Sequence, residues 1–379
     1  MPILHARSHR SRVSSVTKHV QPRDAQAGDN SHYSATLGCT WEHRAPDADV
    51  LFVTNMWPDG ERPVYGIFVQ RQIESLQREG ILCDVLYIRG YRGFHVYPMA
   101  AAWLFLNQIA FRKKYRLVHA HAGETALAIS ALPSIPKVAS YCGDDILGQA
   151  APDGSFPRRA RLRRWLIRQS SRFCTLTITK SQEMALALPS MVQQGNFVVP
   201  NGVNETKFRP VARTEARDAL GWDRDELVVI FIATRPHEPR KRLDLAEAAI
   251  AEAEQRVGPI RLFVAENVPP DELPTIMNAA DGMLLTSRME GSPNAVKEAL
   301  MCNLPVVSTD VGDVAELLDG VARSEVCADT PAALGAALAE ILRTRERSDG
   351  RERRTELKES EIAQRVLSIY DRAGYALKG

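Results

Sequence analysis

The sequence has few cysteines, no long apolar run and almost no excess of charge of either sign. Its six cysteines are scattered without a C-x-x-C pair, so they form neither a disulfide framework nor a zinc site and fit a reducing compartment. No stretch approaches the about 20 apolar residues that a membrane span needs, and the best candidate, 99–111, is interrupted by Asn107 and Gln108. A formal net charge of +2 disfavours a dedicated nucleic-acid-binding protein, so no nucleic-acid partner is expected.

The N-terminal stretch also lacks hydrophobic periodicity and the apolar core of a signal peptide. It is rich in Ser, His and Arg, and Arg7, Arg10, Arg12 and Lys18 all precede the first acidic residue. We therefore expect residues 1–46 to be a disordered basic tail, with a misassigned start as the alternative. Without a signal peptide or a membrane span, the expected location is the cytoplasm.

Apolar runs of strand length alternate with amphipathic helical segments along the rest of the chain. In the first of these helical segments, Ile67, Val69, Ile73 and Leu76 place apolar side chains on one face. Such alternation predicts an α/β fold with parallel, doubly wound sheets. The expected strands are 49–54, 83–88, 116–121, 136–141, 175–179 and 197–200 in the first half, and 227–233, 260–264, 282–286 and 304–308 in the second. One helix of the first half is expected over 98–112.

A polar connector with turn residues, 201–210, separates the two halves. A chain of 379 residues accommodates two domains of ordinary size. We predict a first Rossmann-like domain over 47–203, closed by the C-terminal helix 360–379, and a second such domain over 204–359, with a cleft between them. The charged stretch 344–358 is expected to be a linker or a solvated helix.

Two carboxylates flank the start of a predicted helix in the second half. In the string Met289-Glu-Gly-Ser-Pro-Asn-Ala-Val-Lys-Glu-Ala-Leu300, seven residues separate Glu290 from Glu298. Ser292 suits the N-cap, and Pro293 suits the first helical position because its missing N–H would be unpaired there. On this pattern alone, an ordinary strand–loop–helix with two solvated acids is an equally good interpretation.

A phosphate site is expected beside these acids. The amides of Asn294 and Ala295 would lie free at the positive end of the helix dipole, which favours phosphate. Cationic side chains, Arg235 and Lys241 among them, follow the first strand of the second half. Arg binds a diphosphate as a fork and Lys as a point charge. The arginines on either side of Lys241 leave its assignment open by one residue, and a solvated helix cap is the alternative for any one cation.

The string 289–300 resembles the E-x7-E signature of retaining GT-B glycosyltransferases of family 4. Arg235 and Lys241 stand at the spacing of that family's Arg-x5-Lys element. The segment around Val268 is similar to the family's loop that frames the nucleotide base, and residues 200–210 resemble its interdomain connector. Several separate motifs therefore carry the resemblance.

The resemblance covers about residues 49–375 and implies the GT-B fold, in which two Rossmann-like domains face a cleft. The segments 54–58 and 63–69 look like the opening of teichuronic-acid-type transferases. This likeness implies the branch of the family that acts in cell-surface polysaccharide synthesis.

The resemblance also implies roles for the second-half residues. Glu298 would bind the ribose hydroxyls of the donor, and Glu290 a hydroxyl of its sugar. Arg235 and Lys241 would hold the diphosphate and neutralise the charge that builds on it as it leaves. The donor-binding loop and helix start would comprise Gly291, Ser292, Pro293, Asn294 and Ala295.

In the first half, the resemblance places His121 against the donor sugar, with His119 as a less central sugar contact. A single histidine at a strand end is otherwise more often structural. Gly66, just before a helix, would let backbone approach the phosphates closely. Asp145 could contact a sugar hydroxyl or the acceptor, and Cys142 stands where the family usually has a histidine.

The implied activity is that of a hexosyltransferase. It would move a sugar with retention from a UDP- or GDP-linked donor to a glycan, a lipid-linked or a small-molecule acceptor, in cell-surface polysaccharide or glycoconjugate synthesis. No cofactor or metal is expected, because the cationic phosphate site makes a metal unnecessary; a metal site at the adjacent acids Asp144 and Asp145 is the alternative. A nucleotide-sugar epimerase, a phosphorylase and a non-catalytic GT-B binding protein also remain open.

The helix expected over Arg158–Arg172 carries many arginines and no acidic residue. Such a helix can lie on an anionic membrane surface, here with Trp165 and Leu166 inward. The enzyme would then sit peripherally on the inner membrane face, close to a lipid-linked acceptor. The alternative is a helix packed on its own domain with a solvated basic face.

Overall fold

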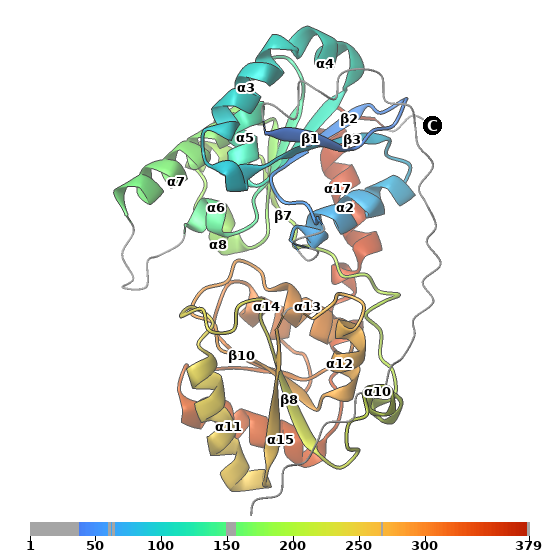
Figure 1. Ribbon diagram of the computed structural model, residues 1–379, viewed down its shortest axis with the longest axis vertical. Coiled ribbons are helices and arrows are strands. Elements are labelled where there is room, and N and C mark those ends of the chain that lie inside the picture. Colours follow the sequence, from blue (N-terminus) through green and yellow to red (C-terminus); the bar gives the residue numbers. More distant parts are fainter. Residues whose placement is uncertain (1–37, 60–61, 63–64, 149–156, 267, 377–379) are drawn as a thin grey trace, which may run out of the picture.

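The computed structural model describes residues 38–59, 62, 65–148, 157–266 and 268–376. Two α/β domains stand one above the other, each built on its own sheet (Figure 1). Both faces of each sheet are covered, because each domain has two separate clusters of buried apolar side chains. The predicted doubly wound architecture in two domains is confirmed.

The first domain has a seven-stranded sheet in the order β1-β3-β2-β4-β5-β6-β7. All neighbours pair in parallel except β1 and β3, so the carboxyl ends of β2 and of β4 to β6 lie at one edge. The strands are β1 Cys39–His43, β2 Val50–Thr54, β3 Cys83–Ile88, β4 Leu117–His121, β5 Lys137–Ser140, β6 Leu176–Thr179 and β7 Asn196–Val198. The α-helices are α2 Ile67–Arg78, α3 Val96–Leu106, α4 Gln108–Lys114, α5 Gly123–Ile129, α6 Asp144–Leu147, α7 Arg158–Ser170, α8 Gln182–Leu186 and α9 Ser190–Gln193.

Two expectations for the first domain need correction. The expected tail over 1–46 is wrong at its end, because β1 pairs antiparallel with β3 and Cys39 is buried; residues 1–37 lie outside the described residues. The single helix expected over 98–112 is two helices, α3 and α4. Asn107 separates them, and its side-chain amide donates to the Trp103 carbonyl at 2.8 Å, which ends α3 locally.

The second domain has a five-stranded, wholly parallel sheet in the order β12-β11-β10-β8-β9. Its strands are β8 Leu227–Ile232, β9 Ile260–Ala265, β10 Gly282–Leu285, β11 Val306–Thr309 and the edge strand β12 Glu325–Cys327. Its α-helices are α10 Arg213–Leu220, α11 Leu243–Val257, α12 Leu273–Ala279, α13 Asn294–Met301, α14 Val314–Leu318, α15 Pro331–Thr344 and α16 Gly350–Arg353. In such sheets, ligands bind beyond the carboxyl ends of the strands.

The last helix, α17 (Glu359–Arg372), returns to the first domain and packs on its sheet. Val366 and Tyr370 are buried in the same cluster as Phe52 of β2. Where the chain crosses back, the backbone of Val203 pairs with that of Leu357 and Glu359 at 2.8 and 2.9 Å. The two crossings between the domains therefore run side by side.

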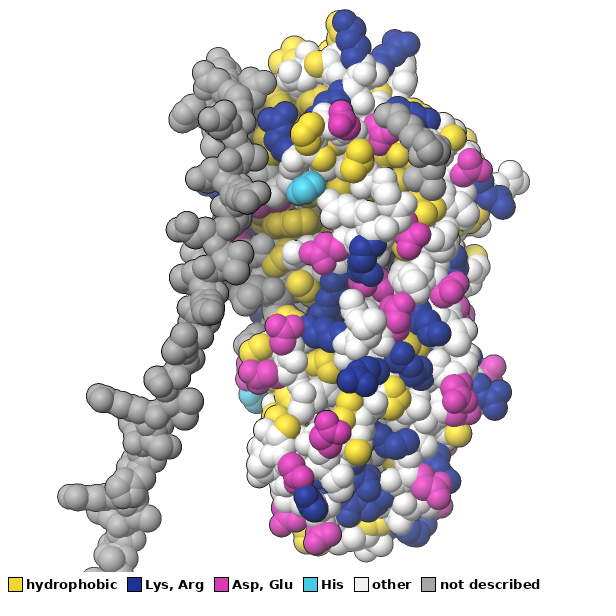
Figure 2. Space-filling view, turned by 90° about the vertical axis from the view of Figure 1, so that its right-hand side faces the viewer, with side chains coloured by type: hydrophobic (Ala, Val, Ile, Leu, Met, Phe, Trp, Pro, Cys, Tyr) yellow, Lys and Arg dark blue, Asp and Glu magenta, His cyan; other side chains and the backbone are white. Residues whose placement is uncertain are grey.

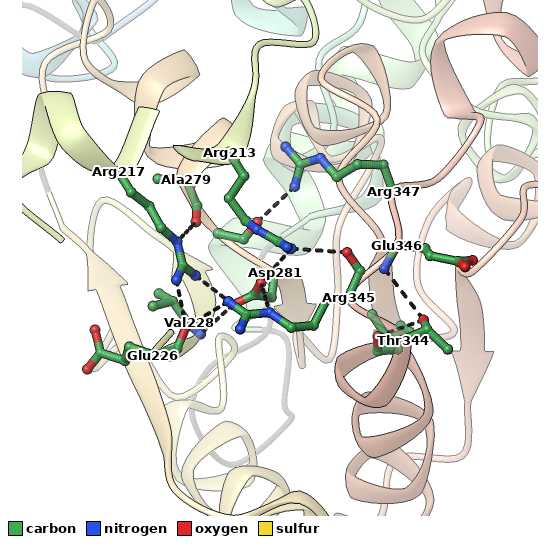
Figure 3. A network of polar contacts seen from close by, with 12 residues as sticks. Arg213, Arg217, Glu226, Val228, Ala279, Asp281, Thr344, Arg345, Glu346 and Arg347 are labelled. Atoms are coloured by element: carbon green, nitrogen blue, oxygen red, sulfur yellow. Dashed lines mark hydrogen bonds and ion pairs between the residues drawn. The ribbon is translucent and has the colours of Figure 1, made fainter. Parts of the chain in front are cut away.

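The stretch 344–358 is bonded to the second domain, so the expectation of a linker or solvated helix is wrong. Leu357 is buried. The guanidinium groups reach backbone carbonyls: Arg347 donates to Ala280 at 2.8 Å and Arg351 to Phe208 at 2.8 Å. Figure 3 shows this segment beside the buried carboxylate of Asp281, which forms ion pairs with three arginines. Arginines of this segment therefore bond to backbone carbonyls and to a carboxylate of the second domain.

Charged side chains of both signs are interspersed on the face of the molecule seen in Figure 2, most clearly over the second domain. That mixture agrees with the net charge of +2. None of the helices that the structure describes is both long and apolar enough to cross a membrane.

Candidate functional site

An open pocket of about 320 Å³ lies between the two domains, at the carboxyl ends of β8 and β10. The first domain contributes the start of α2, and the second domain contributes loops and the start of α13. The lining residues are Ile67, Arg71, Ile232, Ala233, Thr234, Lys241, Ala265, Val268, Pro270, Leu273, Leu285, Glu290, Pro293, Asn294, Ala295 and Glu298. Seven of the predicted site residues line this pocket: Lys241, Val268, Glu290, Pro293, Asn294, Ala295 and Glu298. The predicted cation Arg235 does not line it.

Lys241 and Glu290 form an ion pair inside this pocket. Lys241 Nζ lies 2.5 Å from Glu290 Oε1, and both side chains are largely covered, at 15% and 13% exposure. Ser287 Oγ donates to the same carboxylate oxygen at 2.8 Å. Arg240 bonds to Glu238 at 2.9 Å and lies 3.7 Å from Glu290 Oε2 without lining the pocket, and Arg242 pairs with an acid of the loop that follows β12. Of the three adjacent cations, Lys241 is therefore the one placed in the pocket.

Arg235, the predicted partner of Lys241, points to solvent. Its side chain is 80% exposed and lies 3.9 Å from Glu238. The structure therefore does not bring Arg235 to the pocket, and its predicted contact with a diphosphate stays a prediction. A long, exposed arginine can reach a ligand by rotamer change, which backbone spacing alone does not determine.

Glu298, in the second turn of α13, pairs across the cleft with Arg71 of α2. Arg71 Nη1 donates to Glu298 Oε1 at 3.2 Å. Burial raises the pKa of the Glu298 carboxyl, and the nearby Arg71 opposes that shift. Sequence reasoning missed Arg71. Helical spacing could have identified it. Arg71 lies one turn after Ile67, on the same face of a helix that starts at the cleft.

The helix α13 begins one residue later than predicted. Its first helical residue is Asn294 and its N-cap is Pro293, without a side-chain cap. The prediction of Ser292 as N-cap is wrong because its hydroxyl donates to Asp313 Oδ2 at 2.6 Å. Asn294 and Ala295, whose amides start the helix, both line the pocket. Their N–H groups belong to the first turn, which has no intrahelical acceptor.

A buried network behind the Glu290 loop holds it in place. Lys297 Nζ donates to Ser292 Oγ at 3.0 Å, and Ser292 in turn donates to Asp313. Lys297 is fully buried. Gly291 packs against the first domain: a Cβ there would lie 3.2 Å from the Gly143 Cα. A larger residue at this position would make a tight contact that pushes the two loops slightly apart.

Replacing Lys297 by methionine should change how stability depends on pH. Burial lowers the pKa of Lys297 from 10.5 to about 8, with Asp313 opposing the shift. Between pH 8 and 10.5 the unfolded chain then binds a proton that the folded chain has lost, so the free energy of unfolding rises with pH in that window. Urea unfolding at several pH values should show that the stability of the wild type minus that of Lys297→Met increases over this range. A constant difference would contradict the assignment.

The structure gives His119 and Asp145 mainly structural contacts. His119 bonds through one ring nitrogen to Tyr370 Oη at 2.6 Å and through the other to Ser140 Oγ at 2.8 Å. Burial lowers its pKa to about 3, so it is neutral. The Asp145 carboxylate accepts four backbone N–H groups, including that of Gly123 at 2.8 Å. It joins the loops after β4 and β5, which leaves it little capacity for the predicted sugar or acceptor contact.

His121 ends β4 and is completely buried, and neither of its ring nitrogens has a hydrogen-bond partner within the described chain. It does not line the pocket described above. Gly66 has φ +75° and precedes α2; a Cβ there would lie 2.4 Å from the Met56 carbonyl carbon. This glycine places the start of α2, with Ile67 and Arg71, at the pocket without lining it.

The described residues contain no group of three or more His, Cys, Asp or Glu side chains that could hold a metal ion. Asp144 and Asp145 therefore do not form the alternative metal site within that part of the chain. The expectation that the reaction needs no metal stays a prediction.

Comparisons with known proteins agree with this geometry. Residues 223–344 match the family model described as glycosyl transferases group 1. A Bacillus subtilis (strain 168) protein, provisionally named the teichuronic acid biosynthesis glycosyltransferase TuaC, is 23% identical over 328 residues, which cover 71% of this chain and 82% of that protein.

Solved structures share the fold. Sucrose-phosphate synthase from Thermosynechococcus elongatus matches with a TM-score of 0.70 at 15% identity, over 86% of this chain and 98% of that one. Anabaena Alr3699/HepE in complex with UDP and glucose matches with a TM-score of 0.60 at 17% identity, over 85% and 99%. At this identity the likeness carries the fold alone, which is GT-B. The fold, the group 1 match and the related glycosyltransferases identify this chain as a glycosyltransferase of the GT-B type.

Proposed function

We propose that this protein is a retaining glycosyltransferase of family 4. It transfers a sugar from a UDP- or GDP-linked donor to a glycan, a lipid-linked or a small-molecule acceptor in cell-surface polysaccharide or glycoconjugate synthesis. One observation carries the proposal: Glu290, Glu298, Lys241 and the first amides of α13 converge on a single interdomain pocket. The relationship to a protein named for teichuronic acid synthesis supports the polysaccharide pathway.

The pocket can hold the parts of a nucleotide sugar in order. The apolar lining around Val268 suits the base, and Glu298 lies where it can accept hydrogen bonds from ribose hydroxyls. The amides of Asn294 and Ala295 would bind the diphosphate, since a helix start favours anions. Glu290, at the other end of the same loop, would bind a hydroxyl of the sugar. Charge on the leaving diphosphate would be neutralised by protein groups, so the proposed reaction needs no metal and no cofactor.

Donor binding must rearrange two ion pairs. Before it binds, Lys241 holds Glu290 and Arg71 holds Glu298, so each acid is already compensated within the cleft. A diphosphate would compete with Glu290 for Lys241, and ribose hydroxyls would compete with Arg71 for Glu298. Because both pairs are exchanged for ligand contacts rather than lost, the acids need not be left buried and unpaired.

A thermal-shift screen tests the donor. UDP, GDP, ADP and their sugars should be compared, because a ligand that binds only the folded state stabilises it, by about 2.7 kcal/mol at a hundredfold excess over its Kd. We expect one nucleotide series to raise the Tm and the shift to fall in Glu298→Gln. Transfer to an acceptor with an unchanged anomeric configuration would separate this activity from epimerisation and phosphorolysis. If no nucleotide or nucleotide sugar raised the Tm, the proposal would fail.

We further propose that α7 contacts an anionic membrane surface near the acceptor. Its Arg158, Arg161, Leu162 and Trp165 are exposed, whereas Ile167 packs inward, so a basic and apolar face is presented outward. The helix lies at the outer left edge of the first domain in Figure 1. A basic face with exposed aromatic and aliphatic groups is suited to a lipid interface.

Trp165→Ser should reduce co-sedimentation of the protein with vesicles that contain anionic lipid. The reason is that Trp165, 56% exposed, would lose its favourable place at the interface. Vesicles of neutral lipid are the control. Equal binding of the wild type to both vesicle types would rule out this surface.

A further inference from the structure

Lys180 is a buried lysine whose ammonium group has no hydrogen-bond partner in the described part of the chain. It directly follows β6 and is only 2% exposed. Lys137, another covered lysine of the same domain, shows the usual arrangement: its Nζ donates to the Leu132 carbonyl at 2.6 Å. An ammonium group that is buried without an acceptor is costly. Lys180 therefore lacks what a structural lysine has.

A second group without partners lies at the same edge of the sheet. Strands β4, β5 and β6 are parallel neighbours, so His121, Cys142 and Lys180 stand at or just beyond three adjacent carboxyl ends. Neither ring nitrogen of His121 has a hydrogen-bond partner among the residues that the structure describes. Burial lowers the pKa of His121, and His119 and then the charge of Lys180 add to the shift, which agrees with the proximity of Lys180. A neutral histidine offers one donor and one acceptor.

This edge meets the second domain at the Glu290 loop. A Cβ on Gly291 would lie 3.2 Å from the Gly143 Cα and 3.5 Å from the Met184 Sδ, and Met184 lies in α8, four residues after Lys180. The charge of Lys180 also lowers the pKa of Lys297, which supports the loop from behind. Lys180 and His121 thus lie next to the end of the donor pocket where Glu290 would hold the sugar.

Among the described residues, no side chain accepts a hydrogen bond from Lys180. Burial lowers the pKa of Lys180, and the nearby Cys142 and Asp145 only oppose that shift. The Asp145 carboxylate is occupied by four backbone N–H groups, among them that of Gly143 at 2.9 Å. Burial raises the pKa of the Cys142 thiol to about 12, so it stays neutral. Lysine has three donors and no acceptor, and its strongest partners are anionic oxygens. A substrate with an anionic oxygen would supply the hydrogen-bond acceptor that Lys180 lacks.

We propose that Lys180 binds a carboxylate or phosphate carried by a sugar in the cleft, beside His121, whose contact with a sugar the family resemblance already implies. The substrate class is therefore an anionic sugar, a hexuronate or a sugar phosphate, as the donor sugar or as the acceptor. This inference rests on the proposed function and deepens it. Neither Lys180 nor His121 lines the interdomain pocket that would hold the nucleotide, so we expect both to act on sugar choice rather than on the nucleotide.

The donor arm of the test uses calorimetric titration with the nucleoside diphosphate that the screen selects. It compares the diphosphate alone with the same diphosphate linked to glucose or to glucuronate. These two nucleotide sugars differ only at C6 of the sugar. The acceptor arm adds glucose, glucuronate or glucose 6-phosphate in the presence of the same diphosphate. The variants are Lys180→Met, Lys180→Gln, which keeps a donor without the charge, and Lys137→Met as a matched buried-lysine control.

We expect the wild type to bind the anionic sugar at least about tenfold more tightly than glucose or its ester in one arm. That preference should disappear in both Lys180 variants and persist in Lys137→Met, while binding of the diphosphate alone is unchanged. The proposal is overturned if the wild type shows no such preference in either arm, or if Lys180→Gln retains it. A wild type that binds no nucleotide would instead contradict the proposed function, and glucuronate and glucose 6-phosphate alone would then still test Lys180.

Discussion

Lys241→Ala should lower kcat/KM by about 10²- to 10³-fold, the cost of losing one preorganised donor to a developing negative charge. Of the adjacent cations at 240–242, Lys241 is the one that lines the cleft pocket, 2.5 Å from Glu290 and mostly shielded from water. In such a site a fixed charge interacts with a leaving diphosphate more strongly than it would in bulk solvent. The loss should appear in kcat as well as in kcat/KM, because charge on the diphosphate grows toward the transition state.

The adjacent Arg242 gives a matched control for this prediction. Its guanidinium pairs with Asp329, outside the pocket, so Arg242→Ala should leave kcat/KM nearly unchanged. Comparison of Lys241→Ala, Glu290→Gln and the double variant separates two causes, since Glu290 without Lys241 would keep only Ser287 at 2.8 Å and Arg240 at 3.7 Å. Steady-state kinetics on protein of unchanged Tm provides the measurement. An activity of Lys241→Ala within threefold of the wild type would remove Lys241 from the leaving-group site.

Short-range signals were sufficient for most elements and for one half of the site. The strand expected over 227–233 is β8, Leu227–Ile232, because an uninterrupted run of β-branched and apolar residues suits a strand buried on both faces. Glu290 and Glu298 belong to one contiguous strand–loop–helix. Their placement at a cleft therefore follows from local pattern and from the rule for ligand position in open α/β sheets.

Contacts between distant segments could not be predicted from the sequence. Arg71 and Glu298 are 227 positions apart, so no local pattern joins them. Ser292 has the right chemistry for an N-cap, but Asp313, which follows a different strand, competes for its hydroxyl. The side-chain direction of Arg235 depends on a rotamer. These details are decided by tertiary partners, which override local preference.

For the arginine-rich stretch 344–358, too, the sequence did not predict the partners of the charged side chains. Composition alone favours solvation, but guanidinium groups donate in several directions and can satisfy buried acceptors. Arg345 reaches Asp281 at 3.2 Å, and Arg354 donates to the Leu317 carbonyl at 2.9 Å. The segment is thereby bonded into the second domain, just before the chain returns to the first.

Asp281→Asn should destabilise the second domain by about 3–5 kcal/mol, the cost of removing one partner from a buried charge network. Asp281 is completely buried between α12 and β10. Its carboxylate receives Arg213 and Arg217 at 2.7 Å each, Arg345 at 3.2 Å and the backbone N–H of Val228 at 2.8 Å, as Figure 3 shows in part. Asparagine keeps the shape but removes the charge and leaves one side-chain oxygen for all four donors.

The largest cost should come from Arg217, which is 1% exposed and would lose its only acidic partner within the described network. Whether the intact network is better than an apolar core is a separate question, because desolvation offsets much of its attraction; removal of one partner is costly in either case.

Asp218→Asn is the control, since its pair with Arg224 is on the surface and its loss should leave stability unchanged within error. Urea unfolding should be combined with hydrogen exchange of the β8 and β2 amides, because a two-domain chain need not unfold in one step. We expect protection to fall in β8 and to be retained in β2, and a change below about 1 kcal/mol in β8 would show that the arginines find other acceptors.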